Sequence, residues 1–181
     1  LCAKARQVNG SSNAAIRAFF ENEFAAYQIR DDDRRPDGVV TGYFEPEIQE
    51  GIWSASPDTL IATSLAFAAG RGRKVEGGYE VSGRWPLSSG VDNSDWNMLG
   101  FMVRERDDGP VIDQRFALVH RSQYEIIDNW HAVGLSGTGS KDVATSKLFV
   151  PDIQTITAWA LNGQPHPGSK VNPGPIFRLP L

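Results

Sequence analysis

The stretch from Lys74 to Gly90, KVEGGYEVSGRWPLSSG, decides the fold because it combines a tight turn, a strand and a polar bend. Only glycine reaches positive φ values without a steric penalty, and a tight hairpin turn needs such values. The pair Gly77-Gly78 therefore predicts a β-hairpin whose second arm begins immediately after the turn.

The residues after this turn predict a strand that leads into a bend. Side chains alternate between the two faces of a strand, so Tyr79 and Val81 should share one face. Trp85 then begins a bend that presents Ser88 and Ser89. The end of this strand is thus the first place to look for polar groups near a ligand.

The rest of the chain after Pro57 also reads as short strands separated by turns. Strands are expected at residues 60–65, 95–104, 115–121, 124–130 and 142–150, with a loop at 66–72 and a turn at 107–110. Turn signals about eight to twelve residues apart favour a barrel or sandwich. We expect a mainly β fold, a Greek-key-like barrel from Pro57 to Pro151, followed by an extended tail rich in proline.

The first fifty residues predict a different local structure. Apolar residues recur there at three- and four-residue steps and predict an amphipathic helix that packs on a core: Ile16, Phe19, Phe20, Phe24 and Tyr27. Residues 30–38 read as a charged loop, and Val39 to Phe44 as a short strand. The expected order is therefore a helix and a strand before the β-domain.

Composition excludes several classes of partner. A net charge of -4 and a pI near 5.4 provide no basic field for nucleic acid or anionic lipid. The single cysteine, Cys2, and three scattered histidines predict neither a disulfide nor a metal site. No long apolar run or leader is visible, so a cytoplasmic protein is expected, although the start at Leu1 indicates a truncated N-terminus.

Three segments carry a resemblance to a known family. The runs SGRWPLSSGVDNSDWNMLGFMV, RFALVHRSQYEIIDNWHAVGLSGTGSKDV and LFVP resemble the middle β-domain of flavin-dependent monooxygenases of the acyl-CoA dehydrogenase fold. The resemblance implies hydroxylation of an aromatic or polycyclic substrate by reduced flavin and O2. It also implies a separate flavin reductase and a homo-oligomer, with helical domains that this chain does not contain.

The resemblance implies a cofactor site at the end of the strand that begins with Tyr79. By residue type alone, Trp85 is most often a core residue, and Ser-Ser-Gly is most often a turn. In the similar enzymes the matching Trp and hydroxyl residue lie beside the isoalloxazine, which implies flavin contacts for Trp85 and Ser88, with Ser89 as the alternate. FMN and FAD both remain open, and binding by this chain alone is expected to be weak.

The segment GLSGTGSKD, from Gly134 to Asp142, is a second candidate ligand loop. It lacks the Gly-Lys-Ser/Thr order of a phosphate-binding loop and the spacing of a dinucleotide-binding motif, so its composition predicts a glycine-rich turn. In the similar monooxygenases it usually reads GLRGTGS. Ser136 stands in place of the Arg, so an anion contact is not expected at that position.

The opening segments resemble a second family. LCAKARQV, AAIRAFFENEFAAYQI and GVVTGYFEPEI resemble the N-terminal part of membrane-bound lytic transglycosylase A, although that family's catalytic aspartate has no counterpart here. We therefore divide the chain into a transglycosylase-like fragment at 1–50 and a β-domain at 51–181. A transglycosylase fragment and a non-catalytic β-domain from a rearranged or misassembled reading frame stay open as alternatives.

Overall fold

The structure is a computed structural model that describes residues 40–54, 56, 58–106 and 108–178. The helix expected around residues 16–27 and the charged loop at 30–38 lie outside these residues. The strands are β1 (Ile61–Ser64), β2 (Gly70–Val75), β3 (Gly78–Ser88), β4 (Trp96–Arg104), β5 (Val111–His120), β6 (Glu125–Ile127), β7 (Lys141–Pro151) and β8 (Thr155–Thr157). The prediction of a mainly β fold is confirmed.

Helical segments are short. Within the described residues the α-helix is α3 (Pro46–Trp53). The 3-10 helices are η1 (Thr41–Tyr43), η2 (Phe67–Ala69), η3 (Val91–Asn93), η4 (Arg121–Gln123), η5 (Ser136–Thr138), η6 (Asp152–Gln154), η7 (Ala158–Leu161), η8 (Pro167–Lys170) and η9 (Pro175–Arg178). In this described part of the chain, no helix has the length and apolar character that crossing a membrane requires.

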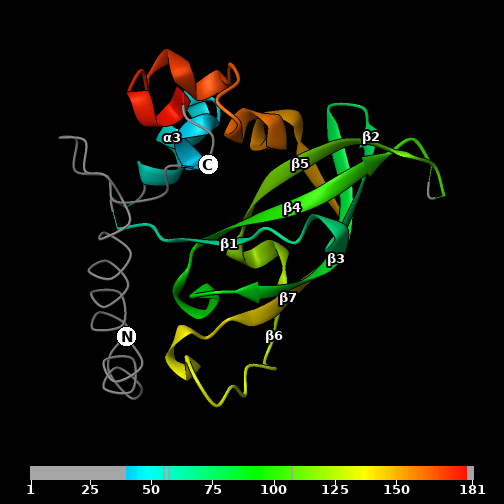
Figure 1. Ribbon diagram of the computed structural model, residues 1–181, viewed down its shortest axis with the longest axis vertical. Helices are drawn as coiled ribbons and strands as arrows, with labels where there is room; N and C mark the ends of the chain where they lie inside the picture. The colour runs from blue at the N-terminus through cyan, green and yellow to red at the C-terminus, as the bar shows by residue number, and fades with distance from the viewer. Residues whose placement is uncertain (1–39, 55, 57, 107, 179–181) are drawn as a thin grey trace.

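The strands form one sheet in the order β6-β7-β3-β2-β4-β5-β8, and β1 adds to it by pairing with β4 (Figure 1). Strands β1 and β2 both run parallel to β4: Ile61 pairs with Trp96 near its start, and Arg71 pairs with Met102 farther along. The loop expected at 66–72 is therefore shorter than predicted, because β2 already begins at Gly70.

The predicted hairpin between β2 and β3 is present, with its turn displaced by one residue. Val75 pairs with Gly78, so the turn is Glu76-Gly77, and Gly77 has the positive φ of 74°. Gly78 belongs to the strand instead. A Cβ atom there would collide with the carbonyl oxygen of Val150 on β7, so the second glycine permits close strand approach.

Two hydrophobic clusters are divided by strand β5. Ala117 and Val119 belong to the first cluster, whereas Phe116 and Leu118 belong to the second. The buried residues of the first cluster are Ala62, Tyr79, Val81, Trp85, Val91, Leu99, Phe101, Val103, Ala117, Val119, Tyr124, Val143 and Val150. Those of the second cluster are Tyr43, Phe44, Ile52, Trp53, Met98, Phe116, Leu118, Ile156 and Ala160. Alternation along one strand thus supplies both faces of the sheet.

The strand predicted at Val39 to Phe44 is wrong for the described residues from Val40 onward. They form the 3-10 turn η1, and Pro46 then starts α3. The amide Nε2 of Gln49 donates to the carbonyl oxygens of Phe44 at 2.9 Å and Gly42 at 3.3 Å. Because these carbonyls are paired locally, no neighbouring strand is needed. Helix α3 also crosses the division proposed at residue 50, which stays a prediction.

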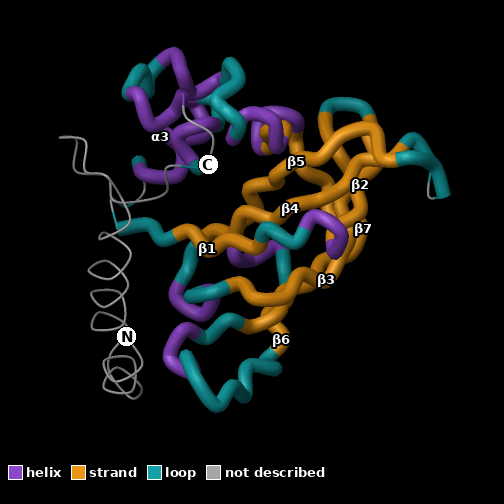
Figure 2. The backbone as a smooth tube through the Cα atoms, in the orientation of Figure 1, coloured by secondary structure: helices purple, strands orange, loops and turns teal. Residues whose placement is uncertain are grey.

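The extended tail is also wrong. After β8 the chain forms 3-10 turns, and two of them start at prolines, whose fixed φ suits a first helical position. The His166 ring lies 4.3 Å from the Tyr43 ring, and Asn172 Nδ2 donates to Gly42 O at 3.0 Å. The tail and α3 therefore lie together at one end of the sheet (Figures 1 and 2).

Candidate functional site

Trp85 lies inside the first cluster, with no exposed surface. Its indole Nε1 donates to the carbonyl oxygen of Gly100 on β4 at 2.5 Å, so the polar end of the ring is also paired within the protein. The bend expected to begin at Trp85 is instead a continuation of β3 as far as Ser88. The geometry supports core packing for this residue and leaves neither ring face open to a ligand.

Ser88 is also fully buried. Its hydroxyl accepts a hydrogen bond from Asn97 Nδ2 at 2.8 Å. Asn97 was not among the predicted site residues, although the sequence carries a signal for it. It is the one amide side chain in the apolar run from Trp96 to Val103, and a buried polar side chain in such a run needs a partner.

Ser89 is the one of the three predicted residues with accessible surface. Its hydroxyl lies 2.8 Å from that of Ser140, which lies 2.7 Å from that of Thr138. The amide of Gly90 donates to Thr138 O at 2.9 Å. The structure thus brings together the Ser-Ser-Gly segment and the glycine-rich segment, two motifs about fifty residues apart in the sequence.

The glycine-rich segment forms the predicted turn. It contains η5 between two residues with positive φ, Leu135 at 54° and Gly139 at 53°. Lys141, near the end of the segment, lies 3.0 Å from Asp92 and 3.2 Å from Asp128, measured between the ammonium and a carboxylate oxygen. The hydrogen bond with Asp92 is the main cause that raises the pKa of Lys141. The ion pair with Asp92 joins the turn to the segment that follows Ser89, and the one with Asp128 joins it to the segment that follows β6.

An irregularity in β3 exposes apolar surface beside Ser89. The pairing of β3 with β7 shifts register between Trp85 and Ser88, and Leu87 has a φ of 60°. The Leu87 side chain is 60% exposed. Ser64 on β1 donates to the carbonyl oxygen of Pro86 at 2.7 Å and so ties the irregular segment to β1. Residue type alone does not predict a positive φ for leucine, so this surface could not be predicted from the sequence.

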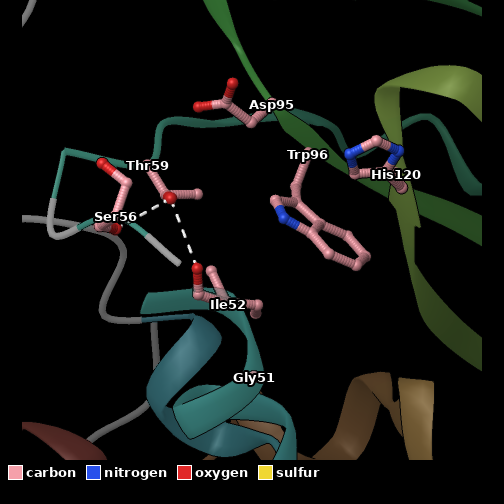
Figure 3. Close-up of a pocket in the computed structure, with 7 residues that line it drawn as sticks. All are labelled: Gly51, Ile52, Ser56, Thr59, Asp95, Trp96 and His120. Atoms are coloured by element: carbon pink, nitrogen blue, oxygen red, sulfur yellow. Dashed lines mark hydrogen bonds between the residues drawn. The ribbon is translucent and has the colours of Figure 1, made fainter. Parts of the chain in front are cut away.

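A separate pocket of about 430 Å³ lies between α3 and the start of β4 (Figure 3). Its lining residues are Gly51, Ile52, Ser56, Thr59, Asp95, Trp96 and His120. The rings of Trp96 and His120 meet edge to face at 5.1 Å. Thr59 donates to the carbonyl oxygens of Ile52 and Ser56, so its hydroxyl is already used. Among the described residues no group of acidic, histidine or cysteine side chains could hold a metal ion.

Comparison with curated proteins and solved structures gives these features a context. The oxygenase subunit HsaA of a flavin-dependent monooxygenase from Mycobacterium tuberculosis is 38% identical over 137 residues, which cover 76% of this chain and 34% of that protein. The crystal structure of the M. tuberculosis HsaA monooxygenase matches with a TM-score of 0.72 and 37% identity, over 77% of this chain and 36% of that chain. The chain is similar to the oxygenase components of flavin-dependent monooxygenases.

Other monooxygenases agree with this relationship. The oxygenase component of an FADH2-dependent resorcinol hydroxylase from a Rhizobium species is 34% identical over 139 residues, which cover 76% of this chain and 34% of that protein. The structure of 3-HSA hydroxylase from Rhodococcus sp. RHA1 matches with a TM-score of 0.74 and 31% identity. The match covers 93% of this chain and 42% of the hydroxylase chain. No protein-family model matches the chain.

The chain spans about a third of the length of the curated monooxygenases it matches. The structural matches establish a mainly β fold of the acyl-CoA dehydrogenase type. Because the matched region is only about a third of an oxygenase, these matches do not extend to the activity of the whole enzyme. None of the relatives named here is a lytic transglycosylase, and that resemblance stays a prediction. Two of its three segments also lie outside the described residues.

The residues at the end of β3 fit a flavin ring only in part. Trp85 and Ser88 have no surface with which to touch it. Leu87 supplies exposed apolar surface, and Ser89 supplies a partly exposed hydroxyl within the same three-residue stretch. A flat, mostly apolar ring with polar atoms on its edge needs such a combination. Leu87 and Ser89 therefore suit contact with a flavin ring better than the buried Trp85 and Ser88 do.

Proposed function

We propose that this chain supplies the flavin-contacting β-domain of an oxygenase that hydroxylates an aromatic substrate with reduced flavin and O2. One observation carries the proposal: an exposed Leu87 and a partly exposed Ser89 lie at an irregular strand end that is held against the glycine-rich turn. The named activities of the similar proteins support the reaction class, because they include a resorcinol hydroxylase and a p-hydroxyphenylacetate hydroxylase.

In this proposal reduced flavin and O2 would supply the oxygen-transfer chemistry. The residues of this chain hold the flavin ring in position. The Leu87 side chain covers part of one ring face and excludes water from it. The Ser89 hydroxyl donates to a polar atom on the ring edge, for which it exchanges its contact with Ser140. FMN and FAD present the same ring system to these groups, so the proposal includes both.

A flavin reductase and an aromatic substrate are the partners that the proposal requires. The resorcinol and p-hydroxyphenylacetate hydroxylases are each named as the oxygenase component of their system, which supports a separate source of reduced flavin. We extend the proposal to a homo-oligomer, in which other protein surfaces complete the flavin pocket. The exposed position of Leu87 is consistent with a pocket that this domain only partly encloses.

Titration of the 181-residue chain with FMN and with FAD tests the proposal. A half-enclosed ring buries little surface while the cost of immobilising it remains, so we expect a Kd of about 100 μM or weaker. The variant Leu87→Asp should weaken binding by about tenfold, because a carboxylate replaces the apolar surface. The control Ile112→Asp changes a side chain that is 54% exposed on β5 and should leave the Kd unchanged. Equal effects of the two variants, or no binding at millimolar flavin, would contradict the proposal.

A further inference from the structure

Asn97 is a buried polar residue whose position is not explained by core packing. It lies in β4 between Trp96 and Met98, and its side chain has no exposed surface. Burial of an amide without a full set of hydrogen bonds is unfavourable, and an apolar residue of similar volume would fill the same space. A fully buried amide in such a place therefore calls for an explanation beyond packing.

The contacts of Asn97 connect two strands and the segment that precedes β6. Its Nδ2 donates to Ser88 Oγ on β3 at 2.8 Å, and both residues are fully buried. Its Oδ1 atom has no hydrogen-bond partner with good geometry, and neither does the buried hydroxyl of Tyr124. The two side chains are nevertheless close enough for Asn97 to lower the pKa of Tyr124, against the larger effect of burial.

The bond from Asn97 reaches the residue next to a strained backbone position. A leucine with a φ of 60° persists only where its surroundings hold it, because L-residues with side chains disfavour this region. Three side chains hold the segment around it. Ser64 binds Pro86 O, Asn97 binds the Ser88 hydroxyl, and Ser140 binds the Ser89 hydroxyl. Of these three bonds, the one from Asn97 is the most deeply buried.

We infer that Asn97 is a positioning residue: its bond to Ser88 holds the segment 87–89 in the conformation that presents Leu87 and Ser89 to a flavin ring. The flavin part of this inference rests on the proposed function. The positioning part rests on the contacts of Asn97 alone. Because Asn97 is fully buried, it cannot touch a ligand itself. It acts through its hydrogen bond to Ser88.

Amide hydrogen exchange and flavin titration of the full chain test the two parts separately. Asn97→Leu removes the hydrogen bond while keeping apolar volume in the core. We expect exchange of the amides at 87–90 to become at least about tenfold faster, with exchange in β4 and β5 unchanged. The Kd for FMN should rise by about tenfold. A purely structural role would instead accelerate exchange throughout the sheet.

Ser88→Ala removes the same bond from the other side and serves if Asn97→Leu does not fold. The double variant should be no worse than either single variant, since all three lack one bond. Tyr124→Phe is the matched control, because it removes a neighbouring buried hydroxyl and leaves the Asn97 to Ser88 bond intact. It should change neither the exchange at 87–90 nor the Kd.

Each outcome has a separate meaning. Unchanged exchange at 87–90 in both Asn97→Leu and Ser88→Ala would overturn the positioning inference, whatever the flavin result. Absence of flavin binding by the unmodified chain would contradict the proposed function and the flavin part of the inference, while the exchange data still decide the positioning part. Faster local exchange with an unchanged Kd would show that Asn97 positions a segment that flavin does not contact.

Discussion

The two hydrophobic clusters on either side of β5 differ in how the chain builds them. The first cluster draws its buried residues from positions 62 to 150, mostly on strands whose side chains alternate. The second combines Tyr43 and Phe44, helix α3, one face of β4 and β5, and the segment that follows β8. The first cluster can be anticipated from local periodicity. The second depends on contacts between segments more than a hundred residues apart, which no local pattern encodes.

Removal of Trp85 should have the largest effect on stability. The ring is fully buried in the first cluster and also donates to Gly100 O, so Trp85→Ala should lower the free energy of unfolding by about 4 kcal/mol. Trp159 is 65% exposed, and Trp159→Ala should change the free energy of unfolding by less than about 0.5 kcal/mol. Urea denaturation followed by circular dichroism measures both. Similar losses for the two variants would mean that Trp85 is not the core residue described above.

Phe44→Ala tests whether the second cluster stabilises the same folding unit. Phe44 is fully buried in the second cluster, so its truncation should cost about 3 kcal/mol. The matched control is Phe149→Ala, whose ring is 50% exposed and whose loss should cost less than about 1 kcal/mol. Thermal unfolding should remain one transition with a lower Tm. A separate early transition in Phe44→Ala would instead support independent parts on either side of residue 50.

Tyr124 gives a smaller, pH-dependent effect in the first cluster. Burial is the main cause that raises the pKa of Tyr124 from 10.0 to about 12. A pKa raised by folding means that the folded state holds the phenolic proton more tightly, so the associated stability is present below pH 10 and is lost between pH 10 and 12. With allowance for partial exposure to solvent, the loss should be about 2 kcal/mol.

The comparison of the unmodified chain with Tyr124→Phe isolates this contribution. Other tyrosines and the lysines titrate in both proteins, so only the difference between their denaturation midpoints from pH 9 to pH 12 reports on Tyr124. The unmodified chain should lose more stability over this range. Parallel pH profiles would show that the hydroxyl of Tyr124 is not buried in the folded chain.

The sequence predicted the parts of the fold that depend on local alternation. The hairpin after β2, the strand from Trp96 to Arg104 and the glycine-rich turn all appear, because each depends on residues close in sequence. The predicted strand ending at Phe44 failed because Gln49 binds the carbonyls that a strand would have presented to a neighbour. The prediction of an extended tail failed because the tail contacts Gly42 and Tyr43, which are far away in sequence.

The candidate site shows the same limit at the level of single residues. From the sequence, the end of β3 is predicted as a flavin site with the ring contact at Trp85, since residue type favours tryptophan for stacking, and this site stays a prediction. In the structure Trp85 is covered and Leu87 is exposed, because a register shift turns the strand between them. A backbone irregularity of this kind has no signature in residue type, so the exposure of Leu87 could not be predicted from the sequence.

The most direct test of the account is a map of where flavin contacts the chain. Backbone amide NMR spectra recorded during FMN addition locate the contact even when binding is weak. The account predicts that the shifted amides cluster at 87–90 and in the glycine-rich turn at 134–140, with smaller changes around the pocket of Gly51 and His120. Shifts centred on that pocket, or spread over the surface without a cluster at Leu87 and Ser89, would contradict it.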